Sequence, residues 1–379
     1  MKLNIEKKEL STITTLVSRA ASNKNITPVL SGILIEASKE TGLTMTATDM
    51  EIGIKTSTNL VDIIEEGTVL VDAHYFADFI KLLPDTTISI ELDEKATRLN
   101  IKYGRSNGII NLFHVQEYPS LPLQNLSAKF TLPQNILKEA LRKTAFAAAA
   151  NHFRPVFTGV LFDILENGKL NIIASDTHRL AYYTYMLEDK DIEPFNFIIP
   201  NRTVQELLRL LDDGEDIINI AFSDNNIIFY QADFLLFSRL IEGQYPNYEQ
   251  VIPEKYTTNV KFNPNTLVTT LERARLMPLD DKIKIQHVKF QFDEKEVMVN
   301  AHSEVIGEIQ EIIEFNEISG DTDLKITFNT NYFLDIAKIY DSECEEIIID
   351  LSGALSPAVV KNPLNENYLY VLVPLRTNI

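Results

Sequence analysis

The chain has 379 residues, of which 45% are apolar and 23% charged, so it can form two or three globular domains and is too apolar to be disordered. Its formal net charge of −19 argues against a protein that coats nucleic acid by bulk electrostatics. The single cysteine excludes an intramolecular disulfide and a cysteine-based metal site. The N-terminus is charged where a signal peptide would be apolar, and no segment approaches the roughly 18 apolar residues of a membrane span, so we expect a cytoplasmic protein.

Three stretches share one pattern, in which an alternating apolar segment runs into a small polar corner and out again. They read LTMTATDMEIGI at residues 43–54, NIIASDTHRLAY at 171–182 and VMVNAHSEVIGE at 297–308. The corner alanines, Ala47, Ala174 and Ala301, are separated by two equal intervals of 127 residues. A period long enough to hold a domain predicts three tandem copies of one domain, which we place at residues 1–126, 127–253 and 254–379.

The first copy is predicted to open with a helix at residues 9–21, where apolar residues recur at the spacing of one buried helix face. These residues are Leu10, Ile13, Val17 and Ala20. Strands follow at residues 29–36 and at the corner. A second helix is predicted at 75–83, and closing strands occupy residues 87–113 around a polar turn at 93–97.

The second and third copies repeat this order, with proline-bearing linkers at 118–127 and 246–256. We predict helices at 134–150, 202–211, 264–277 and 331–340, strands at 156–164 and 286–292, and closing strands at 217–241 and 346–373. Asn201 and Asn329 are typical capping residues. The fold class is therefore α+β, each domain comprising two β-α-β-β-β halves, with six helices and six small antiparallel sheets in the chain.

The predicted helices carry a net charge of +6, so the −19 of the whole chain leaves −25 on strands and loops. One explanation is that surface helices use Lys and Arg because they are good helix formers. The other is that a layer of helices faces a polyanion while acidic sheets face solvent. Lys138 and Arg142 lie one turn apart on the polar side of their helix, and Lys24 and Arg154 follow two helix ends. Contacts of this kind would give weak, salt-sensitive and sequence-independent binding to phosphates.

Catalytic and cofactor motifs are largely missing. Asp176 and His178 with Ser175 or Ser303 could form a hydrolase triad, but the corner lacks a glycine-framed serine, and the other two corners have no histidine at the matching place. The six histidines show no HExxH or paired spacing, and no phosphate-binding glycine motif occurs. We therefore expect neither an enzyme nor a metal or other cofactor. Arg179 is expected to be functional, because an arginine after a strand corner has no helical partner.

Five motifs in register with the period resemble the bacterial DNA polymerase III beta subunit, the sliding clamp family, over the whole length. They are ATDMEIG at residues 47–53, RPVFTGVLFDI at 154–164, ASDTHRLA at 174–181, EGQYPNYEQVIP at 242–253 and YVLVPLR at 370–376. The resemblance implies a head-to-tail homodimer whose six domains close into a ring around double-stranded DNA, with helices on the inner face and sheets outside. Such a processivity factor tethers the replicative DNA polymerase, the clamp loader and repair proteins.

The resemblance also implies three sets of site residues. A hydrophobic pocket for short linear peptides between domains two and three would be formed by Phe157, Ser175, Thr177, His178, Arg179, Leu180, Pro246, Val251, Asn329, Tyr332, Ser356, Val371, Leu372, Val373, Pro374, Leu375 and Arg376. In this pocket Leu180, Val251, Val373 and Leu375 would supply an apolar floor. Rim donors for an acidic or amide-bearing peptide would be His178, Arg179, Asn329 and Arg376.

The other two sets are charged. The DNA-facing residues would be Lys24, Lys81, Lys138, Arg142, Asn151, Arg154 and Arg202. In the dimer interface Arg98, Lys102 and Arg105 would face Glu304, Glu308 and Glu311, beside Leu276 and Met277. Residues 277–292 match the family poorly, and Gly108 stands where the interface strand often carries an aromatic residue. The alternative is therefore a divergent paralogue that acts as a peptide-binding scaffold without a stable ring.

Overall fold

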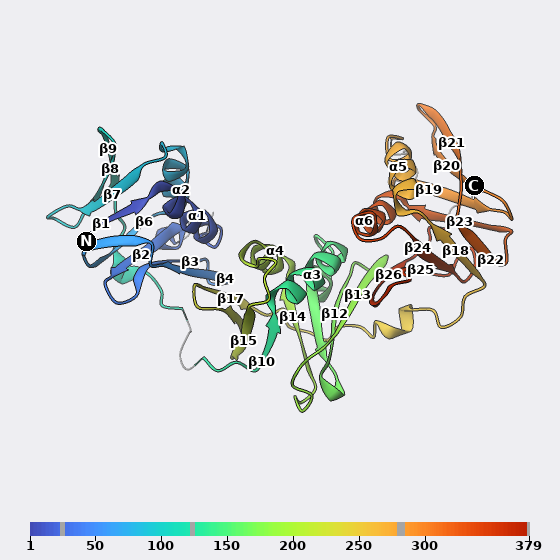
Figure 1. Cartoon of the computed structure of the whole chain (residues 1–379), viewed down its shortest axis with the longest axis horizontal. Helices are drawn as coiled ribbons and strands as arrows, with labels where there is room; N and C mark the ends of the chain where they lie inside the picture. The colour runs from blue at the N-terminus through green and yellow to red at the C-terminus, as the bar shows by residue number, and fades with distance from the viewer. Residues whose placement is uncertain (23–26, 122–125, 279–284, 377–379) are drawn as a thin grey trace. The chain divides into compact units, whose positions relative to one another are not determined.

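A computed structural model describes residues 1–22, 27–121, 126–278 and 285–376 (Figure 1). It divides into two compact units, and the second third of the chain contributes to both. Unit 1 contains residues 1–138 and 202–240, and unit 2 contains residues 139–201 and 241–379. None of the described helices is both long enough and apolar enough to cross a membrane.

Six α-helices occur in the described residues, two for each third of the chain, as predicted. Each buries one apolar face; α1, for example, buries Leu10, Ile13 and Val17. Asn329 caps α6 by accepting hydrogen bonds from two backbone N–H groups, whereas Asn201 is the first residue of α4 rather than its cap. The helices are α1 (Lys7–Ser18), α2 (Ala73–Leu82), α3 (Gln134–Thr144), α4 (Asn201–Leu210), α5 (Pro264–Ala274) and α6 (Thr330–Asp341).

Unit 1 contains two antiparallel sheets. The five-stranded sheet has the order β5-β1-β7-β8-β9, and the eight-stranded sheet has the order β10-β15-β16-β17-β4-β3-β2-β6. The strands are β1 (Lys2–Glu6), β2 (Gly32–Ser38), β3 (Gly42–Thr48), β4 (Ile52–Thr58), β5 (Val61–Glu65), β6 (Gly67–Asp72), β7 (Thr87–Leu92), β8 (Arg98–Tyr103), β9 (Ser106–Asn111), β10 (Phe130–Pro133), β15 (Ile217–Ser223), β16 (Asn226–Tyr230) and β17 (Phe234–Arg239).

Unit 2 contains a nine-stranded sheet of order β14-β11-β12-β13-β26-β25-β24-β18-β22 and a four-stranded sheet of order β21-β20-β19-β23. The strands are β11 (Gly159–Ile164), β12 (Lys169–Ser175), β13 (Arg179–Met186), β14 (Phe195–Pro200), β18 (Thr258–Phe262), β19 (His287–Phe292), β20 (Val297–Ser303), β21 (Gly307–Ile313), β22 (Glu317–Gly320), β23 (Leu324–Asn329), β24 (Ile347–Leu351), β25 (Ala358–Asn362) and β26 (Asn365–Leu372).

The three corners are structurally equivalent, as the 127-residue period predicts. Ala47, Ala174 and Ala301 lie near the ends of β3, β12 and β20, three seven-residue strands. Each strand turns back into the next one, namely β4, β13 and β21, which we call the corner strands. We call β9, β17 and β26, the last strands of the three thirds, the closing strands.

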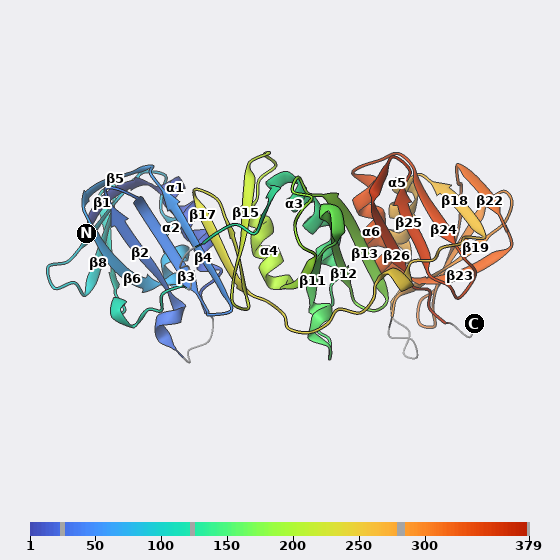
Figure 2. The same ribbon diagram turned by 90° about the horizontal axis from the view of Figure 1, so that it is seen from below.

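The prediction of six separate sheets is wrong, because the described residues form four. Corner strand β4 pairs with closing strand β17, and corner strand β13 pairs with closing strand β26, so sheets from neighbouring thirds merge (Figure 2). The leading strand of a half can also lie in the sheet of the other half, as β1 pairs with β7. Pairing satisfies backbone groups that an edge strand leaves open, which is the physical reason for the merger.

Several predicted boundaries were also wrong. Single 3-10 turns at Pro28–Ser31 and Pro155–Thr158 precede β2 and β11, because a proline favours a turn over the start of a central strand. The helix predicted at 134–150 ends at Thr144 and continues as a 3-10 turn at Ala145–Ala147. With the observed bounds the net charge of the six helices is only +3, so half of the predicted surplus lies outside them.

Candidate functional site

The corner between β12 and β13 is held in shape by its own polar side chains. The Ser175 hydroxyl donates to the carbonyl oxygen of Arg179, 2.7 Å away. Oδ1 of Asp176 accepts from the backbone N–H groups of His178 and Arg179 at 3.0 and 3.1 Å. Thr177 has φ of +77°, which is unusual for a β-branched residue. The corner therefore presents Thr177 and His178 outward on a fixed backbone.

Arg179 is not a rim donor, and the prediction that it lacks a helical partner is wrong. Its side chain is only 9% exposed. The guanidinium donates to the carboxylates of Asp176 at 3.0 Å and Asp335 at 2.7 Å, and to the carbonyl oxygen of Phe146 at 2.6 Å. It also stacks on the ring of Tyr332, 4.1 Å from the centroid. Because Asp335 lies on α6, far along the chain, sequence spacing could not reveal this partner.

A cavity of about 180 Å³ opens beside the corner. Eight residues predicted for the peptide pocket line it: Phe157, Ser175, Thr177, Arg179, Leu180, Pro246, Val251 and Val373. Sequence reasoning missed Tyr245, Asn247 and Tyr248, which also line it. They belong to the motif EGQYPNYEQVIP that supplied Pro246 and Val251, so its position beside Pro246 was the available signal.

Aromatic side chains build the wall of this cavity. The rings of Phe157 and Tyr245 meet edge to face, with centroids 5.6 Å apart. The hydroxyl of Tyr248 donates to Asp163 at 2.8 Å and accepts from the side chain of Asn171 at 3.0 Å. Burial raises the pKa of both tyrosines, so both hydroxyls stay protonated near neutral pH. The wall is thus mainly apolar, with a few hydroxyl groups that remain donors.

A second cavity of about 690 Å³ lies on the other side of the corner. It is lined by Phe146, Ala148, Ala149, Ala150, Asn151, His152, Asp176, Thr177, His178, Arg179, Asn201 and Tyr332. His178 and Tyr332, which were predicted for the first cavity, line only this second one. Thr177 and Arg179 line both cavities and therefore separate them.

The remaining residues predicted for the pocket line neither of these two cavities. Asn329 uses its side-chain oxygen to cap α6. Val371 and Leu372 are fully buried in the sheet, where they contribute packing rather than a binding surface. The backbone N–H of Leu375 donates to Thr327 at 2.7 Å, so Leu375 is not part of the apolar floor of the 180 Å³ cavity. Ser356, Pro374 and Arg376 complete this group.

The residues predicted for the dimer interface occur on two sheet edges. Arg98 and Lys102 lie on β8, and Arg105 immediately precedes β9. Glu308 and Glu311 lie on β21, Glu304 on the turn before it, and Leu276 and Met277 just after α5. Two of these charges have partners within the chain: Lys102 lies 3.8 Å from Glu91, and Glu311 accepts hydrogen bonds from Arg273 that lower the pKa of its carboxyl.

Gly108 on β9 lacks the aromatic side chain that the resemblance implied, and Phe79 of α2 takes up the space. A Cβ atom added to Gly108 would lie 2.7 Å from Cζ of Phe79. The Phe79 ring stacks on Tyr75 at 6.2 Å and meets Tyr103 edge to face at 5.9 Å. An aromatic group is therefore present at this edge, but it is supplied by the helix.

Three of the predicted DNA-facing cations already have acidic partners. Lys138 pairs with Asp213 at 2.8 Å, Arg142 with Glu343 at 2.9 Å, and Arg202 with Asp49. Lys81 and Asn151 are exposed, and Arg154 packs over the ring of Phe153. Lys24 lies outside the described residues. Because the carboxylates partly neutralise these cations, any attraction for phosphates is weak.

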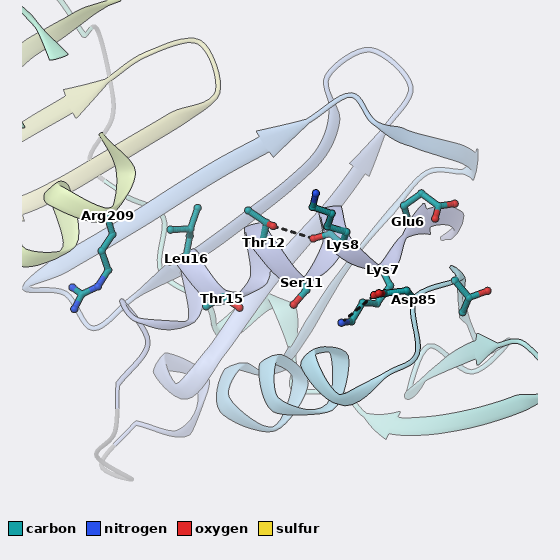
Figure 3. A pocket seen from close by; sticks show the side chains of 10 residues that line it. Glu6, Lys7, Lys8, Ser11, Thr12, Thr15, Leu16, Asp85 and Arg209 are labelled. Atoms are coloured by element: carbon teal, nitrogen blue, oxygen red, sulfur yellow. Dashed lines mark hydrogen bonds and ion pairs between the residues drawn. The ribbon is translucent and has the colours of Figure 1, made fainter. Parts of the chain in front are cut away.

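An open groove of about 900 Å³ follows α1 in unit 1 (Figure 3). Its lining includes the hydroxyl groups of Ser11, Thr12 and Thr15, which Figure 3 shows along one side of the helix. The other lining residues are Glu6, Lys7, Lys8, Leu16, Asp85, Thr86 and Arg209. The Lys7 ammonium lies 3.5 Å from Asp85, so its charge is partly balanced. Sequence reasoning did not identify this polar, weakly cationic surface.

The corner is not arranged for hydrolysis. Asp176 binds Arg179 and two backbone N–H groups, and the Ser175 hydroxyl donates to a backbone carbonyl instead of a histidine ring. Within the parts of the chain that the structure describes, no three His, Cys, Asp or Glu side chains gather as a metal site would require.

Family models match the chain in three successive segments. The DNA polymerase III beta subunit N-terminal domain matches residues 1–122, the central domain matches residues 131–247, and the C-terminal domain matches residues 249–376. A beta sliding clamp from Halalkalibacterium halodurans is 35% identical over 370 residues, which cover 95% of this chain and 96% of that protein.

Solved structures agree with these sequence matches. The DNA polymerase sliding clamp from Bacillus subtilis aligns with a TM-score of 0.90 at 29% identity, covering 100% of this chain and 99% of that one. A sliding clamp from Pseudomonas aeruginosa bound to griselimycin aligns with a TM-score of 0.89 at 26% identity and covers 100% of both chains.

Proposed function

Because the chain belongs to the family of bacterial DNA polymerase III beta subunits and is therefore a DNA sliding clamp, we propose that two copies join head to tail into a ring around double-stranded DNA. A ring holds DNA mechanically, so weak contacts with phosphates suffice. Short peptides of the replicative polymerase, the clamp loader and repair proteins bind in the 180 Å³ cavity. The protein then acts as a processivity factor without catalysing a reaction.

A pairing rule that operates twice inside the chain carries this proposal. The corner strand of the first third pairs with the closing strand of the second, and the corner strand of the second pairs with the closing strand of the third. Corner strand β21 and closing strand β9 remain as sheet edges. Applied between copies, the same rule pairs β21 of one with β9 of the next, which is a head-to-tail contact that closes when two copies satisfy each other.

The repeats also give the register of this contact. Three residues are equivalent because each lies opposite a corner alanine: Ile54, Ala181 and Ile309. Ile54 lies opposite Leu236, and Ala181 lies opposite Tyr370. The equivalent of Leu236 and Tyr370 on β9 is Gly108, because all three oppose matching residues of the preceding strand. Ile309 of one copy should therefore lie opposite Gly108 of the other.

The chemistry of the two edges supports this contact. Ile109 on one edge and Ile312 on the other are exposed, although both are large apolar residues. Leu276, Val305 and Ile306 are also exposed near β21. The edge with β9 carries Arg98, Lys102 and Arg105, whereas the edge with β21 carries Glu304, Glu308 and Glu311. Complementary charges of this kind select the partner and its register.

Disulfide cross-linking tests the ring. In a Cys344→Ser background, Asn107→Cys combined with Gln310→Cys places two exposed thiols opposite each other in the proposed register. Oxidation should give a covalent two-copy circle. When the clamp has been loaded on nicked circular DNA, this circle should remain linked to the DNA in denaturant and should be released by linearising the DNA.

The matched control combines Asn107→Cys with Glu308→Cys, which is two residues out of register and should cross-link poorly. A protein that stays monomeric under these conditions would instead support the peptide-binding scaffold without a ring. Equal retention on circular and linear DNA would show that the hold on DNA is not topological.

A further inference from the structure

The hydroxyl group of Tyr245 stands out among the residues that line the 180 Å³ cavity. Its oxygen is buried and has no hydrogen-bond partner in the described part of the chain. The neighbouring Tyr248 hydroxyl, by contrast, both donates and accepts. Buried hydroxyl groups nearly always have partners, so an unpartnered one in a cavity wall indicates a partner that arrives with a ligand.

The Tyr245 ring cannot easily turn away to find another partner. It packs edge to face against Phe157, and Pro246 follows it in the chain. Both of these residues line the same cavity. The hydroxyl is therefore presented at a fixed place beside apolar side chains such as Leu180 and Val373.

The charges around the cavity determine which ligand group suits this hydroxyl. Arg179 is paired with both Asp176 and Asp335, so these three side chains together carry one negative charge. A carboxylate on the ligand would meet net repulsion, and the paired Arg179 has no strong donor left for it. A neutral carbonyl oxygen avoids this repulsion and still accepts a hydrogen bond from the tyrosine.

The size of the cavity limits what enters. An apolar cavity of about 150 Å³ holds a benzene molecule, so 180 Å³ accommodates one apolar side chain of a peptide. A carbonyl group next to that side chain, either in the main chain or in a side-chain amide, would then lie along the wall that Tyr245 forms.

We propose that the Tyr245 hydroxyl donates a hydrogen bond to a neutral carbonyl oxygen of a partner peptide and thereby selects amide-bearing over acidic peptides. This inference rests on the proposed peptide-binding role of the cavity. It narrows the expectation from the sequence, which allowed either an acidic or an amide-bearing peptide.

Peptide binding to the full-length protein tests this proposal. The probes are 15-residue peptides that tile the replicative DNA polymerase of the same bacterium, and the tightest binder is labelled for fluorescence polarisation. Tyr245→Phe should weaken it by about fivefold to tenfold, as expected for one neutral hydrogen bond. Tyr256→Phe, which removes a hydroxyl outside the cavity, should have no effect.

Substitutions in the peptide identify the group that is recognised. Replacing each Asn or Gln of the peptide by Leu or Met, and each main-chain amide by an ester, should reveal one change that weakens binding to the wild type but not to Tyr245→Phe. Adding a carboxylate there should weaken binding by more than tenfold. Tyr245→Phe should not lower the melting temperature, which separates recognition from a structural role.

The outcomes distinguish this proposal from the one on which it rests. Val251→Arg, at the exposed lip of the cavity, should abolish binding of the probe. If it does, but Tyr245→Phe binds every peptide like the wild type, the role of Tyr245 is refuted and the peptide site stands. If no tile binds, or Val251→Arg binds normally, the peptide site itself is refuted.

Discussion

The Arg179 guanidinium donates a hydrogen bond from Nη1 to Oδ2 of Asp335, 2.7 Å away, and so ties the corner after β12 to helix α6. The same side chain neutralises Asp176 and separates two cavities. Arg179 thus shapes the candidate peptide site by holding its wall, and a partner peptide does not need to contact its charge directly.

Replacing Arg179 should destabilise the protein. Arg179→Ala leaves the buried Asp176 carboxylate without its partner, and the free energy of unfolding of unit 2 should fall by about 3 kcal/mol, measured by urea denaturation. Adding Asp335→Ala should restore part of the loss, because one negative charge is removed. Arg209→Ala removes an exposed, surface-paired arginine and should cost less than about 0.5 kcal/mol. Equal effects of Arg179→Ala and Arg209→Ala would contradict this account.

Thr177 should be less favourable than glycine at its own position. Its φ of +77° imposes strain on a β-branched residue, which glycine does not feel. Thr177→Gly should therefore raise the free energy of unfolding by up to about 1 kcal/mol. Thr184→Gly, in the middle of β13, should lower it by a similar amount. A loss of stability at both positions would show that Thr177 is not strained.

Phe79 should control self-association through its contact with Gly108. Gly108→Ala would displace the end of the Phe79 ring at the open edge, and we expect the dimer dissociation constant to rise by about tenfold in sedimentation experiments. Gly53→Ala is the matched control: its added Cβ also meets a side-chain end, that of Leu121, but β4 is already paired within the chain. Unchanged dimerisation of Gly108→Ala would remove Phe79 from the interface.

Releasing a predicted DNA-facing cation from its acidic partner should strengthen binding to DNA. Asp213→Asn frees Lys138, so affinity for a short linear duplex at low salt should increase by about twofold to threefold. Glu366→Gln changes the net charge equally on an exposed strand of the third domain and should have little effect. An equal increase in both variants would mean that only the total charge matters.

Alkaline pH should unfold the protein as buried tyrosines ionise. Burial raises the pKa of Tyr183, Tyr245, Tyr248, Tyr340, Tyr368 and Tyr370 above the usual 10.0. A raised folded-state pKa contributes stability that is present below about pH 10 and lost as pH rises towards the folded value. Because the chain has no tryptophan, tyrosinate absorbance reports this cleanly. Ionisation of these residues should coincide with loss of circular dichroism; ionisation without unfolding would be the contrary result.

The sequence alone determined the repeat and the elements within it. The 127-residue interval between corner alanines places three equivalent strands, and the six helices appear close to their predicted positions. These features depend on local patterns, because a period of two residues buries one face of a strand and a period of 3.6 buries one face of a helix. The eight correctly predicted residues of the 180 Å³ cavity came from motifs whose spacing is equally local.

Only the tertiary structure decided which distant groups meet. Merging of the sheets depends on the pairing of β4 with β17 and β13 with β26, and Arg179 finds Asp335 at a separation of 156 residues. Phe79 replaces an aromatic side chain that the strand at Gly108 lacks, and Tyr245 is left without a partner beside an apolar cavity. Such contacts are fixed by packing in three dimensions, where the free energy depends on proximity and burial rather than on spacing along the chain.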